Sequence, residues 1–77
     1  MAITVYSKPS CVQCDATKRK LNKLELPYTI INVAEDKKAL EFIISLGYMQ
    51  APVVVADNDH WSGYNPDKIN ALVSAAA

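Results

Sequence analysis

The sequence predicts a single α/β domain in which a four-stranded mixed sheet is flanked by three helices, in the order β-α-β-α-β-β-α. Short β-branched or aromatic segments alternate with segments whose apolar residues recur every three or four positions. Segments of strand character lie on both sides of the first helical segment, which indicates a βαβ unit with parallel strands and a right-handed crossover. The last two strand segments are separated only by turn-forming residues, as in a hairpin.

Length and composition are those of one small globular domain over residues 1–77. The chain has 77 residues, of which 51% are hydrophobic, and its formal net charge is zero. Zero net charge argues against an electrostatic nucleic-acid binder. The N-terminal segment lacks the basic start of a secretory signal, and no apolar run is long enough to cross a bilayer. Two cysteines three positions apart, without such a signal, indicate a cytoplasmic protein, and we expect neither nucleic-acid nor membrane partners.

The two cysteines of the chain follow the first predicted strand and lie at the start of the first predicted helix. Residues 3–6 are β-branched or aromatic and form the strand. Ser10 with Gln13 fits a capping box, which predicts that the helix starts at the cysteines. Pro27 prevents the helix from continuing, so it ends near Glu25. Its buried stripe is predicted at Cys14, Thr17, Leu21 and Leu24.

The second strand and the second helix follow directly. Residues 28–33 form the strand, and either Glu35 or Asp36 opens the helix. Gly47 is a natural C-terminal stop for this helix. Its apolar face is predicted at Ala39, Leu40, Ile43 and Ile44.

Proline and turn residues organise the rest of the chain. Pro52 opens the third strand, a position at which its missing N–H is tolerated. Residues 57–59 form the hairpin turn, and His60 starts a short fourth strand. Residues 62–66 form a loop, and Pro66 lies in the first turn of the last helix, which frays over residues 75–77. The apolar positions of that helix are Ile69, Leu72 and Val73.

The spacing of Cys11 and Cys14 is typical of a redox-active dithiol. Two side chains three positions apart lie on one helix face with Cβ atoms about 5–6 Å apart, within reach of a disulfide after modest adjustment. Free N–H groups and the helix dipole stabilise a thiolate at Cys11, so we expect Cys11 to be the exposed nucleophile and Cys14 the buried, resolving thiol. The alternative is a zinc or iron–sulfur site, which needs about four ligands. His60 is the only other soft ligand in the sequence, so such a site would require a second chain or an external thiol.

Three motifs give the chain a resemblance to a known family: CVQC at residues 11–14, QAPVVV at residues 50–55 and HWSGYNPD at residues 60–67. In this order they resemble the thioredoxin superfamily in its short, glutaredoxin-like form, and within it the NrdH-redoxins. The resemblance implies a thioredoxin fold and a dithiol–disulfide oxidoreductase. It also implies that thioredoxin reductase supplies electrons from NADPH and that class Ib ribonucleotide reductase receives them. No cofactor would be bound by the chain itself.

The resemblance also implies details of the site. Pro52 would be cis and lie against the disulfide, and the loop at Trp61 would pack beside the active site. Two positions depart from the expected pattern, because Tyr64 replaces a phenylalanine and Asn65 an arginine. The missing charge affects any ion pair that the arginine would make, but not the dithiol chemistry.

Several residues have candidate supporting or substrate-binding roles: Lys8, Val12, Gln13, Ala51, Pro52, Trp61, Ser62 and Gly63. Lys8 is close enough in sequence to Cys11 to favour a thiolate, but a solvated strand-end lysine is an equal interpretation. An exposed Val12 suits a docking surface. The backbone of Ala51 is available to an incoming extended peptide. Trp61 either packs under the site or anchors a partner, and we favour packing.

Two other functions remain open from the sequence. A glutathione-dependent glutaredoxin would, by family resemblance, hold glutathione with small glycines and an acidic pair ahead of the last helix. Here Tyr64, Asn65 and Pro66 follow Gly63 and crowd that place, although Lys8 could grip a carboxylate. A non-catalytic binding module would use the cysteines as a structural disulfide or as ligands of a shared metal.

Overall fold

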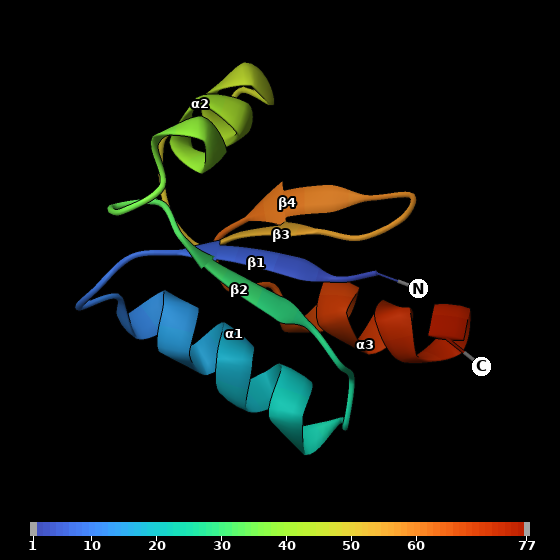
Figure 1. The fold of residues 1–77 in the computed structure, drawn as a ribbon. Coiled ribbons are helices and arrows are strands. Elements are labelled where there is room, and N and C mark those ends of the chain that lie inside the picture. The colour runs from blue at the N-terminus through green and yellow to red at the C-terminus, as the bar shows by residue number, and fades with distance from the viewer. Residues whose placement is uncertain (1, 77) are drawn as a thin grey trace.

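The computed structural model describes residues 2–76 and shows one four-stranded mixed sheet with three helices (Figure 1). The elements are β1 (Thr4–Ser7), α1 (Val12–Lys23), β2 (Thr29–Asn32), α2 (Lys37–Ser45), β3 (Val53–Val55), β4 (His60–Ser62) and α3 (Pro66–Ala76). The strand order is β2-β1-β3-β4, with β1 parallel to β2 and antiparallel to β3, and with β4 antiparallel to β3. The predicted element order and mixed sheet are confirmed.

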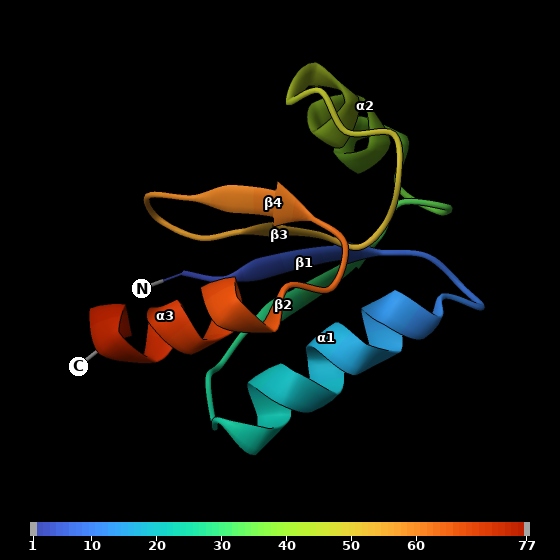
Figure 2. The same cartoon turned by 180° about the vertical axis from the view of Figure 1, so that it is seen from behind.

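The helices cover the two faces of the sheet unequally. Figures 1 and 2 show α1 and α3 on one face and α2 alone on the other. Successive strand residues point to opposite faces, so Val54 joins the core under α1 and α3 whereas Val53 joins the core under α2. The first core consists of Ile3, Val5, Leu21, Leu26, Val54, Trp61, Ile69 and Leu72. The second is smaller, with Val33, Ala39, Ile43 and Val53.

The predicted capping box at the start of α1 is wrong. Ser10 has a φ of 57°, in the left-handed region, whereas a capping residue needs extended backbone. Cys11 has that backbone, with φ −117° and ψ 106°, and it is the N-cap of α1. The buried stripe is confirmed at Cys14, Thr17 and Leu21, while Leu24 is half-buried at the C-cap.

Helix α2 begins and ends where the sequence indicates, but its predicted apolar face is only half buried. The Asp36 carboxylate accepts the backbone N–H of Ala39 at 3.0 Å, and Gly47 follows the helix with a φ of 94°. Ala39 and Ile43 are buried, whereas the side chains of Leu40 and Ile44 are 39% and 46% exposed. A single short helix on this face covers the sheet with a narrow stripe, so the flanking apolar positions remain in solvent.

The start of α3 depends on Asn65, whose capping role was not predicted from the sequence. Asn65 Oδ1 accepts the backbone N–H of Lys68 at 3.1 Å, which makes Asn65 the N-cap, with Pro66 as the first helical residue. An asparagine directly before a proline is a known signal for a helix start. Along α3 the apolar positions Ile69 and Leu72 are buried, but Val73 is 41% exposed, contrary to expectation. The helix continues to Ala76, and the last residue of the predicted frayed end lies outside the described residues.

Candidate active site

Cys11 and Cys14 form a disulfide at the N-terminus of α1, with their Cα atoms 5.2 Å apart. The backbone N–H of Cys14 donates a hydrogen bond to Cys11 Sγ at 3.1 Å. Because Cys11 is the N-cap, its sulfur lies where the helix leaves N–H groups without backbone partners. We therefore expect these groups, with the positive end of the helix dipole, to favour a thiolate at Cys11 over one at Cys14 in the reduced protein, which stays a prediction.

The two cysteines differ in accessibility, though by less than expected. Cys11 is 9% exposed and Cys14 is 1% exposed. The expectation that Cys11 is an exposed side chain is therefore wrong for the disulfide form. The Ala51 carbonyl oxygen lies 3.8 Å from Cys11 Sγ, so part of the sulfur is covered by backbone. Cys11 is nevertheless the more accessible of the two residues, which suits it to react first with an incoming disulfide.

The segment before β3 approaches the disulfide from the α2 side. The Ala51–Pro52 peptide bond is cis, as the family resemblance implied, and Pro52 is buried. The Pro52 carbonyl accepts the Gly63 N–H at 2.8 Å, and the Ser62 hydroxyl donates to the Gln50 carbonyl at 3.3 Å. Residues at the end of β4 therefore bind the backbone on both sides of Ala51.

Gln13, between the two cysteines, connects α1 to the loop before α3. Its side-chain oxygen accepts the Tyr64 N–H at 3.0 Å, instead of completing a cap. Gly63 adopts a φ of 84°, and a Cβ atom at this position would lie 3.1 Å from the same Gln13 oxygen. A glycine is thus needed here both for its backbone conformation and for the close approach of the Gln13 side chain.

The other predicted site residues lie in different surroundings. Val12 is 80% exposed, next to Cys11. Lys8 is exposed just after β1, and its effect on the thiolate stays a prediction. Trp61 is 5% exposed within the core under α1 and α3, and Lys68 Nζ lies 5.6 Å from the centroid of its ring. This burial supports packing rather than partner anchoring for Trp61.

An apolar groove of about 320 Å³ lies beside the disulfide, on the side of α2. It reaches the site at Ala51, whose carbonyl faces Cys11. Met49 is 82% exposed at its edge. Its walls include Lys8, Leu40, Ile44, Tyr48, Met49 and Ala51. Leu40 and Ile44 were not predicted as site residues, because helical periodicity places them in a core.

Within residues 2–76, no three His, Cys, Asp or Glu side chains come together in a group that could hold a metal ion. In the same part of the chain, no helix combines the length and apolar character that crossing a membrane requires.

Comparison with known proteins agrees with this geometry. The glutaredoxin family profile matches residues 3–61. The chain is 43% identical over 72 residues to the glutaredoxin-like protein NrdH of Escherichia coli K12, covering 94% of this chain and 89% of that protein. It is 36% identical over 70 residues to the NrdH protein of Lactococcus lactis MG1363, covering 91% and 97%.

The solved structures agree with the sequence comparison. The structure of the NrdH-redoxin from Escherichia coli, a glutaredoxin-like protein with a thioredoxin-like activity profile, superposes with a TM-score of 0.91. The superposition covers 94% of this chain and 95% of that one, at 43% sequence identity. The predicted thioredoxin fold is thereby confirmed. The chain belongs to the glutaredoxin family and, within it, to the NrdH-redoxins, which are thiol–disulfide oxidoreductases.

Proposed function

We propose that this redoxin carries two electrons from thioredoxin reductase to the large subunit of class Ib ribonucleotide reductase, in the cytoplasm. The observation that carries the proposal is the likeness over nearly the whole chain to an NrdH-redoxin with a thioredoxin-like activity profile. In this scheme NADPH supplies the electrons through the reductase, and the redoxin needs no bound metal or organic cofactor. The cytoplasm fits because thiols are kept reduced there.

The chemistry uses the two cysteines in turn. The Cys11 thiolate attacks one sulfur of the partner's disulfide; an S–S bond forms as the partner's S–S bond breaks, and the departing thiolate takes a proton. The Cys14 thiolate then attacks Cys11 Sγ, forms the Cys11–Cys14 disulfide and releases the second partner thiol. Two electrons have moved to the partner, and thioredoxin reductase returns two electrons to the redoxin. The lower exposure of Cys14 suits the second, intramolecular step.

The loop before α3 favours a protein reductant over glutathione. A glutathione site needs free backbone N–H groups and an acidic side chain to pair with the amine of the tripeptide. Here the Tyr64 N–H is already donated to Gln13, and Asn65 caps α3 with its side-chain oxygen. Tyr64, which is 40% exposed, crowds the place where a glutaredoxin would hold glutathione. A protein disulfide would instead use the exposed apolar surface of Val12 and Met49 and the backbone edge at Ala51.

A paired assay tests the proposal. NADPH oxidation is followed with thioredoxin reductase and, separately, with glutathione plus glutathione reductase, at equal redoxin concentration and with one disulfide substrate. We expect efficient turnover with thioredoxin reductase and little with glutathione. The reductase assay is then repeated with class Ib ribonucleotide reductase as the electron acceptor. Turnover with glutathione alone would refute the proposal and indicate a glutathione-dependent glutaredoxin.

A further inference from the structure

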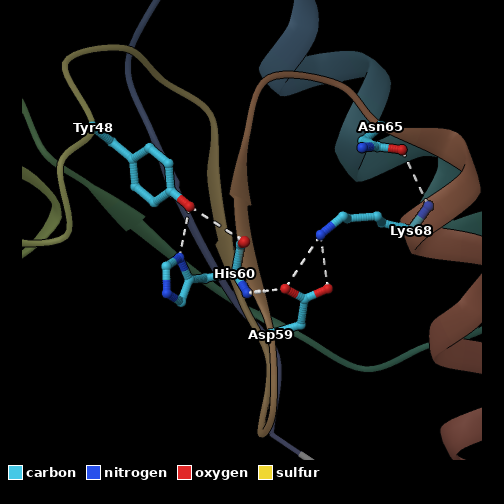
Figure 3. A network of polar contacts seen from close by, with 5 residues as sticks. All are labelled: Tyr48, Asp59, His60, Asn65 and Lys68. Atoms are coloured by element: carbon cyan, nitrogen blue, oxygen red, sulfur yellow. Dashed lines mark hydrogen bonds and ion pairs between the residues drawn. The ribbon is translucent and has the colours of Figure 1, made fainter.

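Tyr48 and His60 form a two-point contact between the segment that follows α2 and the start of β4. The Tyr48 hydroxyl lies 2.6 Å from His60 Nδ1 and 3.2 Å from the His60 carbonyl oxygen (Figure 3). The two rings also meet edge to face, with centroids 5.5 Å apart and an interplanar angle of 78°. None of the active-site contacts described above includes this pair.

The two hydrogen bonds together determine the position of a proton. A tyrosine hydroxyl has one hydrogen, so it cannot donate to both acceptors at once. Both bonds form if His60 Nδ1–H donates to the Tyr48 oxygen while the Tyr48 O–H donates to the His60 carbonyl. The geometry therefore assigns neutral His60 to the Nδ1–H tautomer. Protonation of the other ring nitrogen leaves both bonds intact.

The segment that this pair restrains leads directly to the disulfide. Residues 47–51 lie between α2 and β3 without regular secondary structure. Tyr48 lines the apolar groove at one end of the segment, and at the other end the Ala51 carbonyl faces Cys11 Sγ. Between them lies the bond from the Ser62 hydroxyl to the Gln50 carbonyl, which at 3.3 Å is long. The Tyr48 contacts are the shorter side-chain restraint on the segment.

We propose that the Tyr48–His60 pair positions the groove wall and the Ala51 edge for protein substrates, and thereby determines the affinity of the redoxin for an extended, cysteine-bearing peptide segment. The proposal rests on the proposed function in one respect, namely that the natural oxidant is a protein disulfide. A segment that is already ordered loses less conformational entropy when a peptide docks on it. A small disulfide contacts only the Cys11 sulfur, so an ordered groove does not increase its affinity. Tyr48 and His60 are thus positioning residues.

The first test compares two disulfides in single-turnover reactions of the pre-reduced redoxin, with no reductase present. Insulin serves as the protein disulfide and bis(2-hydroxyethyl) disulfide as the small one. For insulin, Tyr48→Phe removes both hydrogen bonds and should raise the half-saturating concentration about three- to tenfold, with little change in the limiting rate. For the small disulfide the rate constant should change less than twofold. His60→Ala should give the same pattern, and the double variant should add little to either single one.

Lys68→Met is the matched control. It breaks the ion pair of Lys68 with Asp59 at 2.9 Å, which lies on the α3 side of the same strand start (Figure 3). The half-saturating insulin concentration should stay within twofold of the wild-type value. Equal insulin affinity in Tyr48→Phe and wild type, or an equal loss toward both disulfides, would overturn the proposal.

The second test determines which ring nitrogen of His60 carries the proton. The chain has one histidine, so the ¹⁵N resonances of its ring are assigned without ambiguity. We expect the neutral imidazole of the wild type to be the Nδ1–H tautomer and to shift toward Nε2–H in Tyr48→Phe. An Nε2–H tautomer in the wild type would refute the paired hydrogen bonds. Neither test uses thioredoxin reductase or glutathione, so failure here is distinct from failure of the proposed electron source.

Discussion

Replacing Gly63 by alanine tests whether the loop before α3 is tied to the redox site through Gln13. Gly63 has a φ of 84°, and its Cβ would lie 3.1 Å from Gln13 Oε1. Gly47 is a natural control, because its φ of 94° is similar but nothing lies within 4 Å of a Cβ there. The backbone penalty should therefore be shared by both variants, and the contact with Gln13 should affect only one.

The expected magnitudes follow from these two costs. A left-handed backbone costs a residue with a Cβ about 1–2 kcal/mol, so Gly47→Ala should lower the free energy of unfolding by that amount. In Gly63→Ala the Gln13 oxygen must also move and weaken its bond to the Tyr64 N–H, which adds about 1 kcal/mol. The total for Gly63→Ala is then about 2–3 kcal/mol.

Urea unfolding of the oxidised protein measures both values, provided that the m-values match. In a Gln13→Ala background the extra cost at Gly63 should vanish, because the oxygen that a Cβ would approach is gone. If Gly63→Ala is no more destabilising than Gly47→Ala, or if the extra cost persists without Gln13, the tie between this loop and the CVQC segment contributes nothing measurable.

The remaining predictions concern the cysteines and three polar residues. Cys11→Ser should abolish activity, whereas Cys14→Ser should trap a mixed disulfide visible by mass spectrometry; stable trapping by Cys11→Ser would reverse the assigned roles. Lys8→Ala should slow alkylation of Cys11 by iodoacetamide at neutral pH if the lysine stabilises the thiolate, and an unchanged pH profile would leave Lys8 a solvated residue. Asn65→Ala should cost about 1 kcal/mol in urea unfolding through loss of the α3 cap, with Asn65→Asp as the conservative control. The hydrogen bonds from Lys68 hold the pKa of Asp59 below its usual value, so the stabilisation is present at neutral pH and is lost as the pH falls through that lowered pKa. Below about pH 4 the wild type should therefore lose more stability than Asp59→Asn, and equal losses would exclude the ion pair as a contributor.

The elements of the fold could be predicted because their signals are local. Strand residues, helix periodicity and stop residues such as Gly47 act within a few positions, and these predictions were confirmed. The capping box failed although its signal is local too, because Ser10 adopts a left-handed backbone and leaves the cap to Cys11. Conversely, Asn65 was interpreted only as a missing arginine, although the asparagine–proline pair by itself predicts a helix start.

The contacts that build the site could not be predicted from the spacing of residues in the sequence. The Tyr64 N–H and the Gln13 oxygen are 51 positions apart in sequence, and the Cys11 sulfur and the Ala51 carbonyl are 40 apart. The motif resemblance located all four of these residues but did not pair Tyr64 with Gln13 or Cys11 with the Ala51 carbonyl. Which backbone group meets which side chain depends on how the loops after α2 and β4 are placed over the sheet.

Two apolar residues of α2 were predicted to be buried but are exposed, and this difference bears on function. Period and composition assign Leu40 and Ile44 to the core as firmly as Ile43, because all three lie on the apolar side of one helix. All three line the groove that reaches Ala51, but Ile43 is buried whereas Leu40 and Ile44 are exposed on its wall. An apolar surface kept in water has an unfavourable free energy that a docking partner relieves by covering it. The residues of α2 at which the core prediction fails therefore lie on the wall that a protein disulfide would cover under the proposed function, and Tyr48 lies on the same wall, held by His60.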